Sequence, residues 1–186
     1  MLAAVDTLWW VAGGWALELF CEYPHRSHKD LDIGVLRQHA PLVLAALDAW
    51  EFFEARNGSL FRLAAGEVPN AAANSLWGRP NGQTTWTLEL VLDESDADRW
   101  VFRRNPAITM PLAHAIRRSS EGIPYLAPEI QLLYKARDAR PEDQADFKCC
   151  APLLDSQALK WLQEAIGNSD PNHQWLPALA NLCAEG

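Results

Sequence analysis

The 186-residue sequence predicts an α/β protein, in which a small mixed β-sheet flanked by helices is followed by a helical C-terminal region. Three observations support this class. Short β-rich runs alternate with helix-like segments early in the chain, the strand signal fades beyond Pro106, and helix-like segments dominate from Pro128 onward. We therefore expect an α/β domain over residues 1–105 and a helical region over residues 106–186 that packs on it.

Local patterns place the individual elements. A short apolar run that ends at a Gly-Gly pair is typical of a buried strand followed by a tight turn. Pro128 at a first helical turn, with Glu129 after it, marks the start of a helix. The expected strands are 7–12, 30–36, two weaker ones within 52–65 around Asn57-Gly58, 84–92 and 100–103; the expected helices are 15–20, 41–50, 128–138, 143–154 and 156–166; residues 66–82 are expected to be loop-rich.

The charge balance limits the possible partners. Sixteen Lys and Arg residues against 24 Asp and Glu give a formal net charge of −8. This balance argues against a nonspecific nucleic-acid binder and against a basic membrane-surface protein. No apolar run approaches the roughly 20 residues that span a bilayer. The first residues lack a basic segment and include Asp6, so no signal peptide is expected.

The four cysteines are sparse. Cys149 and Cys150 are adjacent, which fits neither a zinc-ligand spacing nor the disulfide framework of a secreted protein. We expect all four to be reduced, as small buried hydrophobic residues of a cytoplasmic protein.

Two carboxylates mark the strand at 30–36. Asp30 and Asp32 are two residues apart, so the period of a strand places both on one face. Neighbouring carboxylates raise each other's pKa unless a cation lies between them. Mg²⁺ favours a site of one or two carboxylates completed by water and phosphate oxygens. The pair therefore indicates a Mg²⁺ site, although a strand that turns its acids to solvent has the same pattern.

Three further features favour a site for a phosphorylated ligand. Gly13-Gly14 stands between a strand and a helix, where backbone N–H groups approach a phosphate closely. Glu89 is a lone acid in an apolar strand, which suits a third metal ligand or a general base, and Asp93 is the alternative third acid because it shares that face. Lys135, one of only four lysines, follows an apolar run in a helix, where it either serves the site or reaches water.

Together these motifs resemble the nucleotidyltransferases, in particular the aminoglycoside 2″-O-adenylyltransferases and the lincosamide nucleotidyltransferases. The resemblance rests on the Gly-Gly-Trp-Ala turn at 13–16, on His28-Lys29-Asp30-Leu31-Asp32 and on the later strand with its third acid. Further segments, at 86–94, 122–136 and 143–147, resemble other nucleotidyltransferase-like proteins, so that the likeness covers residues 7–175.

The resemblance implies the nucleotidyltransferase fold and a reaction. The enzyme would move a nucleoside monophosphate, AMP from ATP or from another nucleoside triphosphate, to a hydroxyl of a small acceptor and release pyrophosphate. Two Mg²⁺ ions would be held by Asp30, Asp32 and Glu89. The implied nucleotide contacts are Gly13, Gly14, Trp15, His28 and Lys135. Asp143 and Asp146 are expected to brace the helix that carries Lys135, and antibiotic resistance follows from the likeness only.

The sequence leaves the identity of the acceptor, and two rival functions, open. Five acids between residues 89 and 98, without a base, suit a polycationic acceptor such as an aminoglycoside if they line the cleft, and otherwise form a solvated turn. Asp93 and Trp100 are the expected acceptor contacts, although Trp100 also suits the core. A binding module without transfer activity is one rival function, and a toxin-system nucleotidyltransferase acting on protein or RNA is another. The acidic balance and the lack of a basic groove weigh against RNA.

Overall fold

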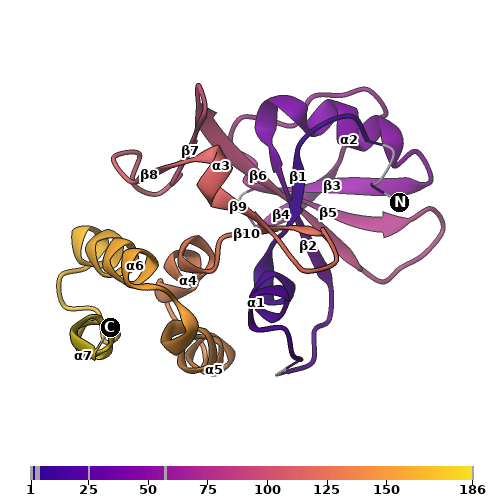
Figure 1. Cartoon of the computed structure of the whole chain (residues 1–186). Helices are drawn as coiled ribbons and strands as arrows, with labels where there is room; N and C mark the ends of the chain where they lie inside the picture. The colour runs from indigo at the N-terminus through magenta and orange to yellow at the C-terminus, as the bar shows by residue number, and fades with distance from the viewer. Residues whose placement is uncertain (1, 3–4, 25, 57, 186) are drawn as a thin grey trace.

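The structure, a computed structural model, describes residues 2, 5–24, 26–56 and 58–185. A sheet-containing part built mainly from the N-terminal half lies beside a group of helices from the C-terminal half (Figure 1). The predicted α/β class, with a mixed sheet, is therefore confirmed.

One sheet path joins eight strands in the order β4-β3-β5-β6-β2-β1-β10-β9, and β7 and β8 extend it from β6. The β2–β6 and β1–β10 pairs are parallel, and the other pairs are antiparallel. The strands are β1 (Trp9–Val11), β2 (Leu31–Leu36), β3 (Trp50–Arg56), β4 (Ser59–Arg62), β5 (Ser75–Pro80), β6 (Leu88–Asp96), β7 (Arg99–Val101), β8 (Thr109–Pro111), β9 (Ile116–Arg118) and β10 (Pro124–Leu126).

Helices lie beside this sheet and continue beyond it. The α1 helix follows β1 directly and packs against α4 and α5, and α4 also packs against α6. The helices are α1 (Gly13–Cys21), α2 (Ala40–Ala46), α3 (Leu112–Ala115), α4 (Pro128–Ala136), α5 (Pro141–Cys150), α6 (Ser156–Ser169) and α7 (Leu176–Glu185), with the short 3₁₀ turns η1 (Arg37–His39) and η2 (Ala151–Leu153).

The alternation along β6 determines which side of the strand meets the core. Leu88, Leu90 and Leu92 are at most 1% exposed, whereas Glu89 and Val91 between them are partly exposed. Burying apolar side chains on one face drives this orientation. The polar face of β6 is thereby left for the cavity described below.

Several elements were absent from the prediction. No strand was expected after residue 106, yet β8, β9 and β10 occur there, and β10 pairs with β1 at the Val11–Tyr125 position. Each has only three residues, too few to show the period of two on which strand prediction depends. The sheet consequently continues to residue 126, beyond the predicted division at residue 105; the division into two domains stays a prediction.

The loop expected at 66–82 contains β5, whose pattern is interrupted by Gly78 and Pro80. Gly78 is needed there because a Cβ would lie 2.7 Å from the Phe52 ring on β3. The strand expected from residue 84 begins only at Leu88. Leu88 pairs with Gly78 of β5, and this is the first residue of β6 in the β5–β6 register. The helix expected to reach residue 50 ends at Ala46, because Trp50 opens β3. The α7 helix was not predicted.

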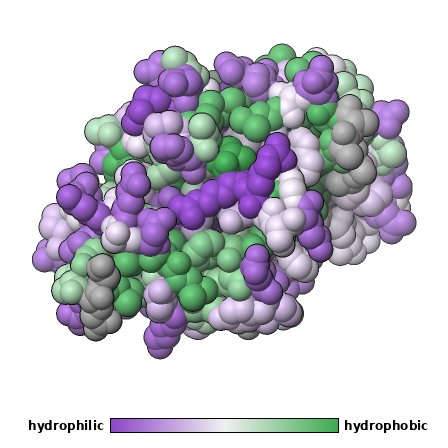
Figure 2. All heavy atoms as spheres, in the orientation of Figure 1, coloured by the Kyte–Doolittle hydropathy of each residue, from purple (hydrophilic) through white to green (hydrophobic). Residues whose placement is uncertain are grey.

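No helix in the described part of the chain is long and apolar enough to cross a membrane. Strongly hydrophilic side chains form a band across the middle of the face seen in Figure 2, between more apolar areas.

Candidate active site

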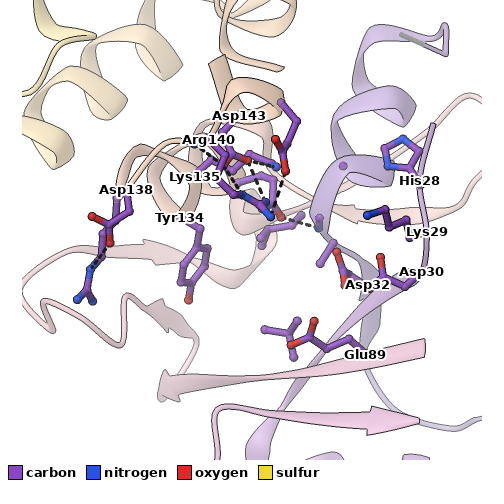
Figure 3. A pocket seen from close by; sticks show the side chains of 18 of the residues that line it. His28, Lys29, Asp30, Asp32, Glu89, Tyr134, Lys135, Asp138, Arg140 and Asp143 are labelled. Atoms are coloured by element: carbon purple, nitrogen blue, oxygen red, sulfur yellow. Dashed lines mark hydrogen bonds and ion pairs between the residues drawn. The ribbon is translucent and has the colours of Figure 1, made fainter. Parts of the chain in front are cut away.

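Strands β2 and β6 bring three carboxylates together. Asp32 and Glu89 are partners in the parallel β2–β6 pair, and Asp30 lies two residues before Asp32. One ligand oxygen from each lies within 4.8 Å of the others. The three side chains gather at one end of a cavity, as Figure 3 shows. The structure thus assembles the trio that the sequence singled out.

Gly13 makes room for this group. It begins α1 with a φ of +64°, and a Cβ on it would lie 1.7 Å from Asp32 Oδ2. Any side chain at this position would therefore collide with the carboxylate, in addition to the strain of a left-handed backbone. The Gly13 N–H donates a 2.8 Å hydrogen bond to Gln131 Oε1 of α4, which fixes the turn.

Burial and mutual repulsion make the ionised trio costly. Burial, followed by the charges of Glu89 and Asp30, raises the pKa of Asp32 to about 7, although Lys135 and Arg26 oppose the shift. Burial also raises the pKa of Glu89, against a hydrogen bond with Ser75. A cation between the oxygens would remove this penalty. Three convergent carboxylates are a donor set that fits Mg²⁺.

The first turn of α1 forms a corner that suits an anion. A Cβ on Gly14 would lie 2.0 Å from Arg26 Nη2 and 2.4 Å from His28 Cε1, so this glycine lets both side chains pack on the helix start. The His28 Nε2 lies 2.9 Å from Glu18 Oε1 on the same helix. The backbone N–H groups of a first turn carry partial positive charge, and Arg26 adds a full one.

Lys135 is held by two acids of α5. Its Nζ lies 2.7 Å from Asp143 Oδ1 and 2.9 Å from Asp146 Oδ2. Asp146 is fully buried and also accepts a 2.9 Å hydrogen bond from Arg26 Nε. The expectation that Asp143 and Asp146 brace this region is confirmed, and the acids do so by binding the lysine itself. One buried carboxylate therefore positions both cations.

A cavity of about 840 Å³ contains these groups. In the described part of the chain its walls include Asp30, Asp32, Glu89, Gly13, Gly14, His28 and Lys135. Trp15 does not line it, so the predicted direct nucleotide contact is not supported. Its indole N–H donates to the Asp30 carbonyl at 3.1 Å, and its ring lies 4.5 Å from that of His28. Trp15 thus contacts the loop before β2 through Asp30 and His28.

Three arginines also line the cavity, together with Asp138, which pairs with Arg137. Arg103, Arg104 and Arg137 line it, and the Cζ atoms of Arg103 and Arg104 lie 5.1 and 5.7 Å from the Tyr134 ring. Burial, followed by the charges of Arg103 and Arg137, lowers the pKa of Arg104. An anionic group placed here would relieve the repulsion between the guanidinium groups.

The two predicted acceptor contacts are buried. Trp100 is 0% exposed and packs against Phe102 and Tyr134, so the prediction for Trp100 is wrong, because its indole belongs to the core. Asp93 borders the cavity but is 1% exposed and accepts a 2.8 Å hydrogen bond from the Tyr134 hydroxyl. Burial raises its pKa to about 6. Glu89, and not Asp93, joins the two aspartates.

The remaining acids of the 89–98 segment lie outside the cavity. Glu94 pairs with Arg37, and Asp96 and Asp98 are exposed. They form the solvated turn that was one of the two interpretations, and they offer no acidic wall to a polycation.

Two residues of the site, Arg26 and Gln131, were missed. Arg26 and Asp146 are 120 positions apart, so no local pattern reveals their pairing. Gln131 gave a usable signal, since it is a polar residue in an otherwise apolar helical segment and is 7% exposed. A buried amide there requires a partner, which is the N–H of Gly13.

Comparisons with known proteins agree with this geometry. Residues 1–65 match the family model of the aminoglycoside-2″-adenylyltransferases, which covers about a third of the chain. No curated protein matches the chain.

Three solved structures show the fold. The lincosamide antibiotic adenylyltransferase LnuA, solved with lincomycin, has a TM-score of 0.56 at 18% identity, over 80% of this chain and 89% of its own. The antibiotic-resistance factor ANT(2″)-Ia has a TM-score of 0.56 at 13% identity, over 97% and 90%. A nucleotidyltransferase-like protein from Paracoccidioides brasiliensis has a TM-score of 0.51 at 18% identity, over 98% and 87%. The predicted resemblance to the nucleotidyltransferases is confirmed.

Proposed function

From its nucleotidyltransferase fold, we propose that the chain is a metal-dependent nucleotidyltransferase that moves a nucleoside monophosphate, AMP from ATP, to a hydroxyl of a small acceptor. The observation that carries this proposal is the convergence of Asp30, Asp32 and Glu89, with ligand oxygens within 4.8 Å, beside the start of α1. A cluster of ionised acids is costly without a cation, and it lies where a phosphate would be attracted.

The triphosphate would lie between the first turn of α1 and Lys135. Two of the three N–H donors of Lys135 are directed to Asp143 and Asp146, which leaves the third for a phosphate oxygen. Arg26 is similarly fixed by Asp146 through Nε and Nη2. Cations that are already held in place stabilise developing charge without reorganising during the reaction.

In the transfer, the acceptor hydroxyl attacks the α-phosphorus, the bond from that phosphorus to the bridging oxygen breaks, and pyrophosphate leaves. Mg²⁺ held by the three carboxylates would neutralise charge on the phosphate oxygens. In the alternative role that the sequence suggests for it, Glu89 would take the proton of the hydroxyl while Asp30 and Asp32 hold the ion. Arg26 and Lys135 balance the charge of the leaving pyrophosphate.

The acceptor class follows from the relatives and from the cavity. ANT(2″)-Ia is an antibiotic-resistance factor and LnuA binds a lincosamide, so hydroxylated antibiotics are the first candidates. The cavity has room for such a molecule beside a nucleotide's phosphates, and its walls carry Arg103, Arg104 and Arg137 together with Asp138 and Glu142. Because acids and bases are mixed in this lining, the acceptor panel includes neutral and cationic hydroxylated molecules.

Label transfer tests the proposal. The protein is incubated with Mg²⁺, each α-labelled nucleoside triphosphate and a panel of lincosamides, aminoglycosides, other small polyols, tRNA and cell lysate, while pyrophosphate is measured. We expect release and transfer with ATP and a small acceptor, abolished in the double variant Asp30→Asn/Asp32→Asn. Asp98→Asn is the matched control, because Asp98 is an exposed acid outside the cavity. ATP binding without any transfer would instead indicate a binding module, and transfer that survives the double variant would refute the metal assignment.

A further inference from the structure

A second cluster of metal-ligating side chains lies at the other end of α1. Cys21 is the last residue of α1, and Cys149 and Cys150 are the last two of α5. The sulfurs of Cys21 and Cys150 are 3.1 Å apart, and all three sulfurs lie within 4.8 Å of one another. The sequence spacing fits no zinc motif because the third sulfur comes from a distant helix. Three thiols are thereby collected at one point, which the interpretation as isolated apolar residues does not explain.

The spacing matches a thiolate metal site. Zinc–sulfur bonds of about 2.3 Å in tetrahedral geometry place sulfurs about 3.8 Å apart. To reach that value, the sulfurs of Cys21 and Cys150 would move apart by less than an ångström. In the described part of the chain no histidine or carboxylate joins the group. The Tyr23 hydroxyl lies 2.6 Å from the Cys149 sulfur, so an oxygen is available at the fourth position.

The surroundings favour a cation over free thiolates. The three cysteines stand at the C-terminal ends of α1 and α5, and helix C-termini carry partial negative charge. The negative charge of Asp146 acts on Cys21 and Cys150 as well, and a cation would offset it. Cys21 and Cys150 are buried, while Cys149 is partly exposed, so an ion has access from one side.

We propose that Cys21, Cys149 and Cys150 form a three-thiolate site for a thiophilic divalent cation such as Zn²⁺ or Cd²⁺, with an oxygen as fourth ligand. Each thiol gives up its proton on binding, so that the ion replaces three protons. The bound ion ties the end of α1 to the end of α5. These helices also carry Gly13 and the acids that hold Lys135, so the site is placed to brace the cavity.

A titration with Cd²⁺ tests this without reference to nucleotidyl transfer. The reduced full-length protein is titrated anaerobically in excess Mg²⁺, and the ultraviolet thiolate-to-metal charge-transfer band is recorded together with the protons released. Carboxylates give no such band, so Cd²⁺ bound at Asp30, Asp32 and Glu89 does not interfere. We expect saturation at one ion per chain with release of close to three protons, and a higher melting temperature with Zn²⁺.

Single variants assign the ligands. Cys149→Ser and Cys21→Ser should weaken Cd²⁺ binding by at least tenfold and reduce the band, whereas Cys183→Ser should leave both unchanged, because Cys183 lies on α7 beside Gln163. Circular dichroism checks folding, and the partly exposed Cys149 keeps the test valid if the buried positions prove intolerant. A band that persists unchanged in Cys149→Ser, no band in the wild type, or a Cys21–Cys150 disulfide that persists under reduction would each overturn the proposal.

Discussion

Asp32 is ionised at the expense of stability, because its carboxylate is buried beside Glu89 and Asp30. Its pKa rises from the usual 3.8 to about 7 on folding. Between these values the folded protein binds more protons than the unfolded chain, so the free energy of unfolding decreases as the pH rises. The contribution of Asp32 to stability is therefore fully present below pH 3.8 and is lost as the pH rises through about 7.

Replacing Asp32 with asparagine removes this penalty. The difference between 3.8 and about 7 corresponds to about 4 kcal/mol at high pH, at about 1.4 kcal/mol per pKa unit. The new amide leaves an N–H group without an acceptor at a cost of about 1–3 kcal/mol. We expect the metal-free variant at pH 8 to be more stable than the wild type by about 1–3 kcal/mol, although it has lost activity.

Urea unfolding at pH 5 and pH 8, with a chelator present, measures this effect. The wild type should lose about 3 kcal/mol over that interval relative to Asp32→Asn. Millimolar Mg²⁺ should stabilise the wild type at pH 8 and leave the variant unchanged, because the ion binds the ionised carboxylates. Asp98→Asn, at an exposed acid, is the control and should follow the wild type. Equal pH dependence in wild type and Asp32→Asn would refute the reasoning.

Three further outcomes are expected. Gly13→Ala should reduce transfer at least 100-fold and weaken Mg²⁺ binding measured by calorimetry, because its Cβ would lie 1.7 Å from Asp32 Oδ2; unchanged binding would show that the turn moves freely. Asp146→Asn should raise the KM for ATP about tenfold, the equivalent of about 1.4 kcal/mol, since it removes the charge that holds Arg26 and one of the two that hold Lys135; an effect on kcat alone would contradict this role. Trp100→Ala should lower the free energy of unfolding by about 3–5 kcal/mol, and loss of acceptor binding at full stability would restore Trp100 as a contact.

The strand patterns identified the three carboxylates that the structure brings together, for a physical reason. Asp30 and Asp32 share a face by the period of a strand, and Glu89 interrupts the apolar run of β6, so the sequence identifies the three acids although it does not show that β2 and β6 are neighbours. Their partnership depends on the parallel pairing of Asp32 with Glu89. The three-residue β10 is too short to show such a pattern, yet it pairs with β1 and extends the sheet.

Of the two cations beside the carboxylates, the sequence identified Lys135 but not Arg26. Lys135 stands out because lysine is rare in the chain, but nothing local distinguishes Arg26 from other loop residues. Its place depends on Asp146, which is 120 positions away. The same limit applies to the cysteines, whose clustering appears only when α1 and α5 are packed together.

These long-range contacts also determine how separable the two predicted regions are. The N–H of Gly13 is bound by Gln131 of α4, and Arg26 is bound by Asp146 of α5. The first turn of α1 and the nearby Arg26 are therefore positioned by residues from both halves of the chain. A fragment of residues 1–105 would retain all three carboxylates but would lack Lys135 and both of these partners. The three carboxylates and Lys135 thus belong to different parts of the chain, and the proposed transfer would require the contact between these parts.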